Sequence, residues 1–260
     1  MSLSHDTYAN EILAQTKALT ATIADADLTT PVPSCPGWTL NHLLRHIGHG
    51  HRWAAEIIDT RATTPPPDTA LRDLTHHTNE TPDSLTPWLQ EGATLLSTAL
   101  TTTPTAQIWT PLVPISSPAD ALFFYARRFT HETLIHRADA TLALGKHFTA
   151  APEVTQDALE EWLVLTTLPQ LFTIHPERKA LLAPNRTLHL QTPTTTYEIN
   201  FTGPTLTHTT NPTTSTPTAT ITAPALDLLL HLYQRSTTTS VTQSGDQTFL
   251  TTWKTHSTFG

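Results

Sequence analysis

The sequence predicts a mixed α and α/β fold, in which a four-helix bundle is followed by a smaller α+β domain. Two observations support this class. In the first half, apolar residues recur every three to four positions in four long segments, and Pro-rich connections separate these segments. After Lys146, shorter stretches alternate apolar and polar residues, which is typical of half-buried strands. We therefore expect two domains, residues 1–148 and 149–260.

The first three helices are expected near residues 4–25, from Leu40 to before the prolines at 63–67, and near 82–102. In each, apolar residues follow the three-to-four spacing of one helix face. Thr39 stands where the N-cap of the second helix should lie. The segment TTPVPSCPGW between the first two helices cannot be helical because of its prolines.

The fourth helix has recognisable start and stop signals. Ser117 is the expected N-cap, and Pro118 occupies the first helical position, where a missing backbone N–H costs nothing. Gly145 is the expected C-terminal stop, because glycine readily adopts the left-handed conformation that ends a helix. We therefore expect a long helix from Pro118 to Gly145.

The second half alternates helices and short strands. The Thr- and Pro-rich segment 192–220 has alternating apolar residues, Tyr197, Ile199 and Phe201, which predict one buried face. We therefore interpret this segment as sheet edge and loops. The sequence SGDQTFLTTW near the C-terminus is expected to form a turn and a short helix. The other expected elements are a helix at 153–168, strands at 187–192, 195–202 and 217–223, and a helix at 224–235.

The composition limits the classes of function. The chain has 260 residues, of which 38% are hydrophobic, and a formal net charge of −8. Nucleic-acid binding needs clustered Lys and Arg, which this chain lacks. Cys35 is the only cysteine, which excludes an intramolecular disulfide and a cysteine zinc cluster. No segment approaches the roughly 18 apolar residues of a membrane span. We expect a soluble cytoplasmic protein that binds neither nucleic acid nor membranes.

The segment RRFTHETLIHRADA at 127–140 contains a His-Glu pair and a second histidine, as the zinc helix of a metalloprotease does. Here, however, His131 and His136 are five residues apart, which rotates their side chains by about 140° around a helix. These two rings cannot easily meet at one metal ion. Glu132 and His136 are four apart and differ by only about 40°, so this pair can supply two ligands of one divalent metal.

Glu132 and His136 continue a stripe of the fourth helix that begins with apolar residues. An unpaired carboxylate on an inward face costs several kcal/mol unless a cation or metal ion compensates it. Two interpretations follow from the residues. One is a metal site, and the other is an ion pair of Glu132 with Arg127 or Arg128 beside a hydrogen-bonded core histidine.

The second helix can supply a third ligand from its run HLLRHIGHGHRW. His46 is the best candidate by position, because it lies next to the apolar line that contains Leu43 and Ile47. Two imidazoles and one carboxylate would leave a coordination position open, as in catalytic zinc sites. A metal there would polarise a substrate oxygen or lower the pKa of a bound thiol or water. Other histidines are expected to be exposed, namely His42, His49, His51, His76, His77 and His147.

Three segments together resemble one family. PSCPGWTLNHLLRHIGHGHRWA at 33–54 and RRFTHETLIHRADA at 127–140 resemble the N-terminal domain of the mycothiol-dependent maleylpyruvate isomerases, a branch of the DinB-like four-helix bundles of actinobacteria. The segment at 218–253 is similar to that family's C-terminal α+β domain, which is related to sterol-carrier folds. The resemblance thus covers both halves of the chain in the same order.

The resemblance implies that zinc is held by His46, Glu132 and His136, and that mycothiol is the thiol cofactor. It also implies that Arg235 is a basic catalytic residue near the thiol or the substrate. Because the family uses an exogenous thiol, Cys35 is expected to be a structural thiol at the helix entry rather than a nucleophile. The family often has a large aromatic residue where this chain has Ala138, so the shape of the pocket and the substrate stay open.

The implied activity is a cis-trans isomerisation of a small electrophilic substrate, maleylpyruvate in the family's name reaction. The thiolate of mycothiol adds to an electron-poor double bond, the resulting single bond rotates, and elimination gives the trans isomer. One alternative is a mycothiol S-transferase in detoxification or natural-product biosynthesis. Another is a non-catalytic module that binds a metal or ligand. The sequence leaves the substrate, the pathway and the oligomeric state open, a monomer being one option.

Overall fold

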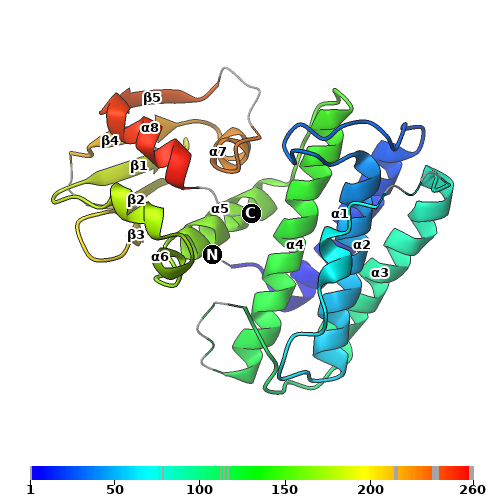
Figure 1. Ribbon diagram of the computed structural model, residues 1–260. Coiled ribbons are helices and arrows are strands. Elements are labelled where there is room, and N and C mark those ends of the chain that lie inside the picture. The colour runs from blue at the N-terminus through cyan, green and yellow to red at the C-terminus, as the bar shows by residue number, and fades with distance from the viewer. Residues whose placement is uncertain are drawn as a thin grey trace. The chain divides into compact units, whose positions relative to one another are not determined.

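The computed structural model describes residues 2–75, 77, 79–111, 113, 115, 117–213, 216–235 and 240–257. The chain divides into two compact units, one up to Thr149 and one from Ala150. The first unit is helical and the second combines a sheet with helices, which confirms the predicted fold class (Figure 1). Among the described residues, no helix is both long and apolar enough to cross a membrane.

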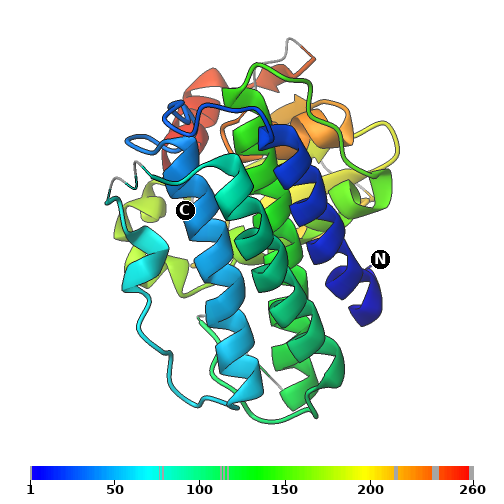
Figure 2. The ribbon, with the colours of Figure 1, turned by 90° about the vertical axis from the view of Figure 1, so that its right-hand side faces the viewer.

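Four long helices form the first unit, and they run side by side in Figure 2. Helix α1 packs against α3 and α4, and helix α2 packs against the same two helices. A short 3-10 helix, η1 (Thr69–Arg72), lies against α2. The long helices are α1 (His5–Ile23), α2 (Leu40–Asp59), α3 (Pro82–Thr102) and α4 (Pro118–Ala143).

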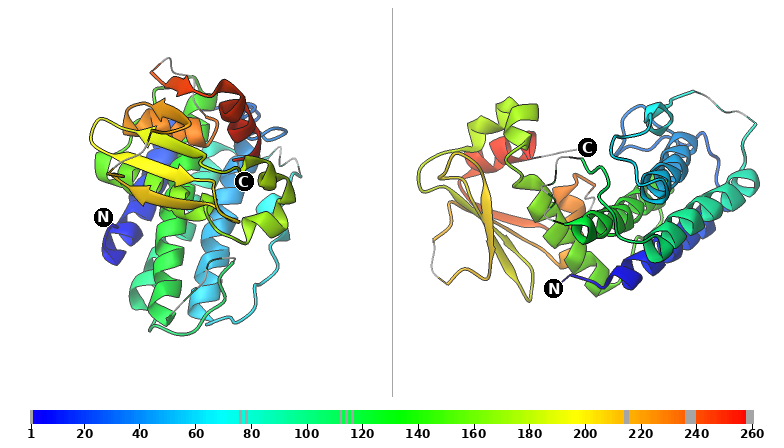
Figure 3. Two further views of the ribbon diagram at one scale, coloured as in Figure 1. Left: turned by 90° about the vertical axis from the view of Figure 1, so that its left-hand side faces the viewer. Right: turned by 90° about the horizontal axis from the view of Figure 1, so that it is seen from below.

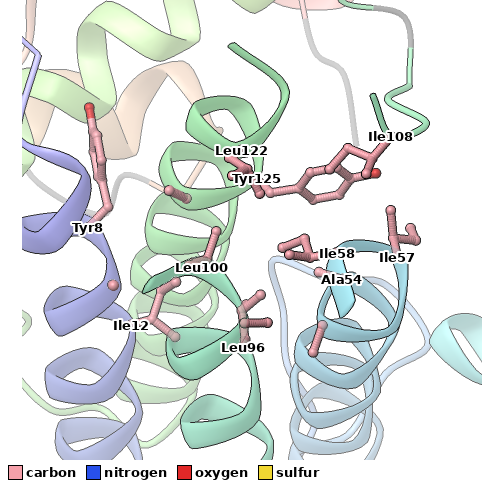
Figure 4. Packing of buried hydrophobic residues seen from close by; sticks show 14 of the residues in the cluster. Tyr8, Ile12, Ala54, Ile57, Ile58, Leu96, Leu100, Ile108, Leu122 and Tyr125 are labelled. Atoms are coloured by element: carbon pink, nitrogen blue, oxygen red, sulfur yellow. The ribbon is translucent and has the colours of Figure 1, made fainter. Parts of the chain in front are cut away.

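The bundle is held together by a shared apolar core. Each of the four helices contributes side chains that are at most 6% exposed, and Figure 4 shows Ile12, Leu96, Leu100 and Ile58 among those in the space between the helices. Full burial of a large apolar side chain contributes about 1.5–3 kcal/mol, so this core outweighs any single polar contact. The labelled members are Tyr8, Ile12, Ala54, Ile57, Ile58, Leu96, Leu100, Ile108, Leu122 and Tyr125.

Helix α4 begins and ends as its sequence predicts. The Ser117 hydroxyl accepts a hydrogen bond from the Asp120 amide at 3.2 Å, and Pro118 occupies the first turn. At the other end, Gly145 has a φ of +65°. The Lys146 and Gly145 amides donate back to the carbonyls of the last turn at 3.0 Å each, which satisfies groups that a helix end leaves unpaired.

Helix α2 begins after Thr39, and His42 helps to cap it. The His42 Nδ1 atom accepts a hydrogen bond from the Thr39 amide at 3.0 Å, and Nε2 donates to the Leu74 carbonyl at 3.1 Å. The side chain is therefore buried, with 3% exposure. The prediction that His42 is exposed is wrong, because a ring that pairs both nitrogens with backbone groups can be buried at little cost.

The second unit contains a five-stranded sheet in the order β3-β2-β1-β4-β5, which Figure 3 shows from two sides. Strands β1 and β4 are parallel, and the other neighbouring pairs are antiparallel. The strands are β1 (Thr187–Gln191), β2 (Thr196–Asn200), β3 (Thr207–Thr210), β4 (Ala219–Thr222) and β5 (Thr242–Gly245). The helical segments are α5 (Pro152–Thr166), α6 (Leu171–Ile174), η2 (Pro176–Leu181), α7 (Ala225–Leu232) and α8 (Gln247–His256).

One of the two edge strands differs from the sequence expectation. Strand β5 includes Ser244 and Gly245, which were expected to form a turn, whereas β3 lies at a sheet edge within the segment that was expected to be sheet edge and loops. All four residues of β5 are exposed, and β3 is almost as open. Alternation of apolar and polar residues reports burial of one face, so an exposed edge strand leaves no such pattern.

Candidate functional site

Three side chains from two helices converge at one place in the bundle. Helix α4 supplies Glu132 and His136 from adjacent turns, and helix α2 supplies His46. The Glu132 Oε1 atom lies 3.0 Å from His136 Nε2 and 3.4 Å from His46 Nε2. All three ligand atoms lie within 4.8 Å of one another. Their side chains are 11–34% exposed, so a small molecule can reach them.

The other ring nitrogen of each histidine is already bound. His46 Nδ1 lies 2.7 Å from the Leu71 carbonyl of η1, and His136 Nδ1 lies 2.9 Å from Asp139 Oδ2. A carbonyl or carboxylate oxygen can only accept, so both Nδ1 atoms carry hydrogen and donate it. In the neutral rings, the Nε2 lone pairs then face Glu132. This is how proteins usually orient histidines that bind a metal.

Glu132 also forms the ion pair of the alternative sequence interpretation. Arg128 Nη2 lies 2.7 Å from Glu132 Oε2, and the pair is four residues apart on α4. Burial raises the pKa of Glu132, but the charge of Arg128 and the hydrogen bond from His136 hold that pKa well below its usual value. Because Arg128 uses Oε2, Oε1 stays directed at the two imidazoles.

His136 is positively charged in the metal-free protein. Burial lowers its pKa, but hydrogen bonds with Asp139, Cys35 and Glu132 raise the pKa well above the usual value of a histidine. The extra proton lies on Nε2, which then donates to Glu132 Oε1. A divalent cation would bind where this proton lies, and two imidazole nitrogens with one carboxylate oxygen are a ligand set of catalytic zinc. The residues present therefore fit a zinc ion.

Asp139 is the neighbour of this site that the sequence interpretation missed. Its side chain is fully buried. Ser34 Oγ donates to Oδ1 at 2.5 Å, and Cys35 Sγ donates to Oδ2 at 3.6 Å. Ser34 and Cys35 of the PSCPGW segment thus fix the position of the Asp139 carboxylate, which in turn accepts the hydrogen bond from His136. The missed signal was the spacing, because Asp139 follows His136 by three residues and must share its helix face.

His131 lies away from the three converging residues. Its fully buried ring contacts Tyr8 of α1 edge-on, with 6.1 Å between the ring centroids. Helix rotation predicted this separation from His136. The HE pair of the sequence is therefore not a protease motif in the structure.

His51 is also buried, at 1% exposure, so the prediction that it is exposed is wrong. Its Nε2 lies 2.8 Å from the Thr133 hydroxyl on α4. Burial above all, together with the charge of Arg52, lowers the pKa of His51 to about 3, so its ring is neutral. His49 and His77 are half-buried and His147 is exposed, whereas His76 lies outside the described residues.

Arg235 lies in the second unit, just after α7, and is half-buried. Its guanidinium group donates to the Tyr233 carbonyl. Its predicted role at the thiol or substrate stays a prediction. The second unit also has a cavity of about 420 Å³, which α7, β5 and α8 line with residues such as Gln243, Gln247 and Lys254. Within the described residues, this cavity has no group of converging metal ligands.

A cavity of about 340 Å³ adjoins the converging residues of the first unit. His46 and Glu132 form part of its wall, together with residues of η1 and the loop before α4. This volume lies in the range of small-molecule sites. The cavity can therefore hold a small molecule beside His46 and Glu132.

The family model of the mycothiol maleylpyruvate isomerase N-terminal domain matches residues 9–141. Two solved structures resemble the chain, and each comparison covers 93% of both chains with a TM-score of 0.62. One is the crystal structure of the mycothiol-dependent maleylpyruvate isomerase, at 15% identity. The other is a mutant of that enzyme with a histidine replaced by alanine, at 14% identity. At such identities the likeness shows the fold alone. No curated protein matches the chain in sequence.

Proposed function

The chain belongs to the mycothiol maleylpyruvate isomerase N-terminal domain family, and from this membership we propose that it is a zinc- and mycothiol-dependent enzyme. We propose that it isomerises a small electrophilic substrate about a cis double bond. The observation that carries the proposal is the convergence of His46 Nε2, Glu132 Oε1 and His136 Nε2 within 4.8 Å. Their spacing and chemistry suit one divalent metal with room for a further ligand.

In this proposal His46, Glu132 and His136 hold the zinc ion. When bound, the ion supplies Lewis acidity and keeps a thiol ionised near neutral pH. Arg128 balances the second oxygen of Glu132, and Asp139 keeps the hydrogen of His136 on Nδ1. Both contacts fix the direction of a ligand atom before anything binds, which lowers the cost of assembling the site.

The proposed reaction conserves the thiol. The sulfur of mycothiol adds to one carbon of an electron-poor cis double bond, and the electron pair of that bond moves toward the conjugated carbonyl. The carbon-carbon bond is then single and rotates. Elimination of the thiolate restores the double bond in the trans form. Maleylpyruvate is the first substrate to test, because the solved structures that resemble the chain are those of a maleylpyruvate isomerase.

Arg235 is proposed to bind an anionic group of the substrate or of the thiol. A hydrogen bond to a charged group contributes about 1.5–3 kcal/mol. We therefore expect Arg235→Ala to lower kcat/KM by roughly 10- to 150-fold, with part of the loss restored in Arg235→Lys. An unchanged kcat/KM in Arg235→Ala would remove this residue from the mechanism.

The metal assignment is tested by metal analysis of the purified full chain. We expect about one zinc per chain, and loss of this zinc in Glu132→Ala. The matched control is Glu56→Ala, which removes an exposed glutamate of α2 and should keep the metal. Full zinc retention in Glu132→Ala would overturn the assignment.

The type of reaction is tested by incubation with mycothiol and maleylpyruvate. Trans product without net consumption of thiol supports the isomerase. A stable thiol adduct of an electrophile would instead show the S-transferase, in which addition is not followed by elimination. A rate that does not depend on thiol with any electrophile would leave only a module that binds a metal or ligand.

A further inference from the structure

The cavity of about 340 Å³ beside the proposed zinc ligands, which we name the chamber, has two different ends. His46, Glu132 and Arg128 lie at one end. Trp53 of α2 and Phe124 of α4 line the chamber seven and eight residues away from His46 and Glu132 along their helices. At 1.5 Å per residue, the chamber therefore extends about 10 Å from the proposed zinc ligands.

Beyond the His46–Glu132 end, the hydroxyl and indole groups of the wall are directed to partners in the protein, whereas His51 Nδ1 has no partner among the described residues but is itself buried. The Tyr125 hydroxyl donates to the Trp109 carbonyl at 2.8 Å, and Trp53 Nε1 donates to the Pro66 carbonyl at 3.2 Å. The Thr133 hydroxyl donates to the Phe129 carbonyl at 2.6 Å.

Since the hydrogen of Thr133 is used there, its oxygen accepts from His51 Nε2 at 2.8 Å. The backbone of α2 and α4 is hydrogen-bonded within each helix. Arg72 also lines the chamber, but its side chain is exposed. The inner wall therefore offers aromatic and aliphatic surface, chiefly from Ile47, Trp53, Leu71, Phe124, Tyr125 and Phe129.

We propose that the chamber takes the apolar body of an electrophile, of the size of a phenyl ring, whose reactive carbon lies at the His46–Glu132 end. The inference rests on the proposed function for that reactive end. A compact substrate that is charged at both ends would leave one charged group against apolar wall, where nothing replaces its lost water. The matching substrate class is an α,β-unsaturated carbonyl compound with an aryl or branched alkyl substituent.

Gly50 keeps the chamber wide in the middle. A Cβ atom added at Gly50 would lie 3.3 Å from Phe129 Cε1 and 4.0 Å from Leu71 Cδ2. A larger side chain at this position would therefore take the space between two walls of the chamber. Glycine inside a helix is unfavourable by roughly 0.5–1 kcal/mol relative to alanine, so the open space has a cost in helix stability.

The first test measures equilibrium binding to the metal-depleted full chain, with two unreactive ketones that differ in one group. We expect 4-phenylbutan-2-one to bind at least tenfold more tightly than pentan-2-one by calorimetry, because the ring buries more apolar surface. Gly50→Val should remove this preference, and Glu56→Val on the exposed face of α2 should keep it. Equal binding of the two ketones, or an unchanged preference in Gly50→Val, would overturn the inference.

A second variant protects the test against loss of folding in Gly50→Val. Phe129→Ala widens the chamber, so it should improve binding of 4-(2-naphthyl)butan-2-one relative to 4-phenylbutan-2-one by about tenfold. Circular dichroism shows whether each variant is folded. No change in this ratio in folded Phe129→Ala would also contradict the inference.

The second test measures thiol addition by the zinc-loaded chain. Mycothiol adds its sulfur to the β-carbon of an enone, and the proton goes to the α-carbon. After correction for the uncatalysed rates, kcat/KM for 4-phenylbut-3-en-2-one should exceed that for pent-3-en-2-one at least tenfold. A ratio near one would contradict the inference.

The two tests separate the two proposals. Ketone binding that depends on Gly50, without any thiol-dependent turnover, would retain the apolar chamber and reject the proposed enzyme. Turnover of maleylpyruvate without preference for a phenyl group would retain the enzyme and reject the chamber as the site of an apolar body.

Discussion

His46 and His51 both belong to α2 and both lie against α4, yet their surroundings differ. His46 has one nitrogen on a backbone carbonyl and the other 3.4 Å from the Glu132 carboxylate. His51 is buried more deeply, and its Nε2 atom is hydrogen-bonded to the neutral hydroxyl of Thr133. The comparison shows that burial does not by itself make a histidine a metal ligand. We propose that His46 is a metal ligand because one of its nitrogens donates to an acceptor and the other faces a carboxylate.

The largest effect is expected from removal of the Glu132 carboxylate, which faces His46. Glu132→Gln keeps the shape of the side chain but removes its charge and one acceptor oxygen. Replacing an outer partner of a metal ligand already costs 10- to 100-fold in affinity. We expect Glu132→Gln, a change in a ligand itself, to weaken zinc binding by more than about 100-fold, measured by competition with a chelator. A loss below tenfold would indicate that Glu132 is only the ion-pair partner of Arg128.

The next effect concerns the acceptor behind His136. In Asp139→Asn an uncharged amide replaces the carboxylate that accepts from His136 Nδ1. We expect zinc affinity to fall roughly 10- to 100-fold while the protein stays folded. Ser34→Ala is the graded control, because it removes one hydrogen bond from Asp139 and leaves its charge. If Asp139→Asn binds zinc as tightly as the unchanged protein does, Asp139 contributes only to packing and not to the metal site.

These two residues show what the sequence could and could not predict. Glu132 and His136 were placed on one face by their four-residue spacing, and the caps of α4 followed from Ser117, Pro118 and Gly145. The contact of Asp139 with His136 could have been predicted from their three-residue spacing, but its contacts with Ser34 and Cys35, about 105 residues away in the chain, could not. Such contacts depend on tertiary packing, which periodicity does not report.

The same reason explains the errors at other histidines. His42 and His51 are polar residues on a helix that looked amphipathic, so exposure was the natural expectation. His42 is buried by its contacts with the start of α2 and with Leu74, and His51 by its contact with α4. Strand β5 was missed because its residues are exposed and carry no alternation.

A smaller effect is expected on the His51 side. Thr133→Val is close in shape, but it removes the oxygen that accepts from His51 Nε2. An unsatisfied buried donor costs about 1–3 kcal/mol, so the free energy of unfolding in urea should fall by that amount at pH 7. Zinc content should stay the same. Loss of zinc in a stably folded Thr133→Val would show that the surroundings of His51 are part of the same metal site as His46.

The smallest effect is a dependence of stability on pH. Folded His51 has a pKa of about 3, against 6.5 in the unfolded chain, so only the unfolded state gains this proton as the pH falls below 6.5. The free energy of unfolding therefore decreases on acidification. Between pH 7.5 and 5.5, His51 should account for about 1.4 kcal/mol of this decrease.

Urea unfolding of the metal-depleted protein and of His51→Gln at both pH values measures this contribution. Other titrating groups are common to both proteins, so the difference between their decreases isolates His51. Equal decreases in the two proteins would mean that His51 takes up a proton in the folded state.

We propose that zinc is held by His46, Glu132 and His136, and not by His51, the more deeply buried histidine of the helix that carries His46. The most direct measurement is the zinc content of His46→Ala and His51→Gln, purified and reloaded side by side. We expect His46→Ala to lose its zinc, whereas His51→Gln should keep about one zinc per chain. Zinc retained in His46→Ala, or lost from folded His51→Gln, would contradict the proposal.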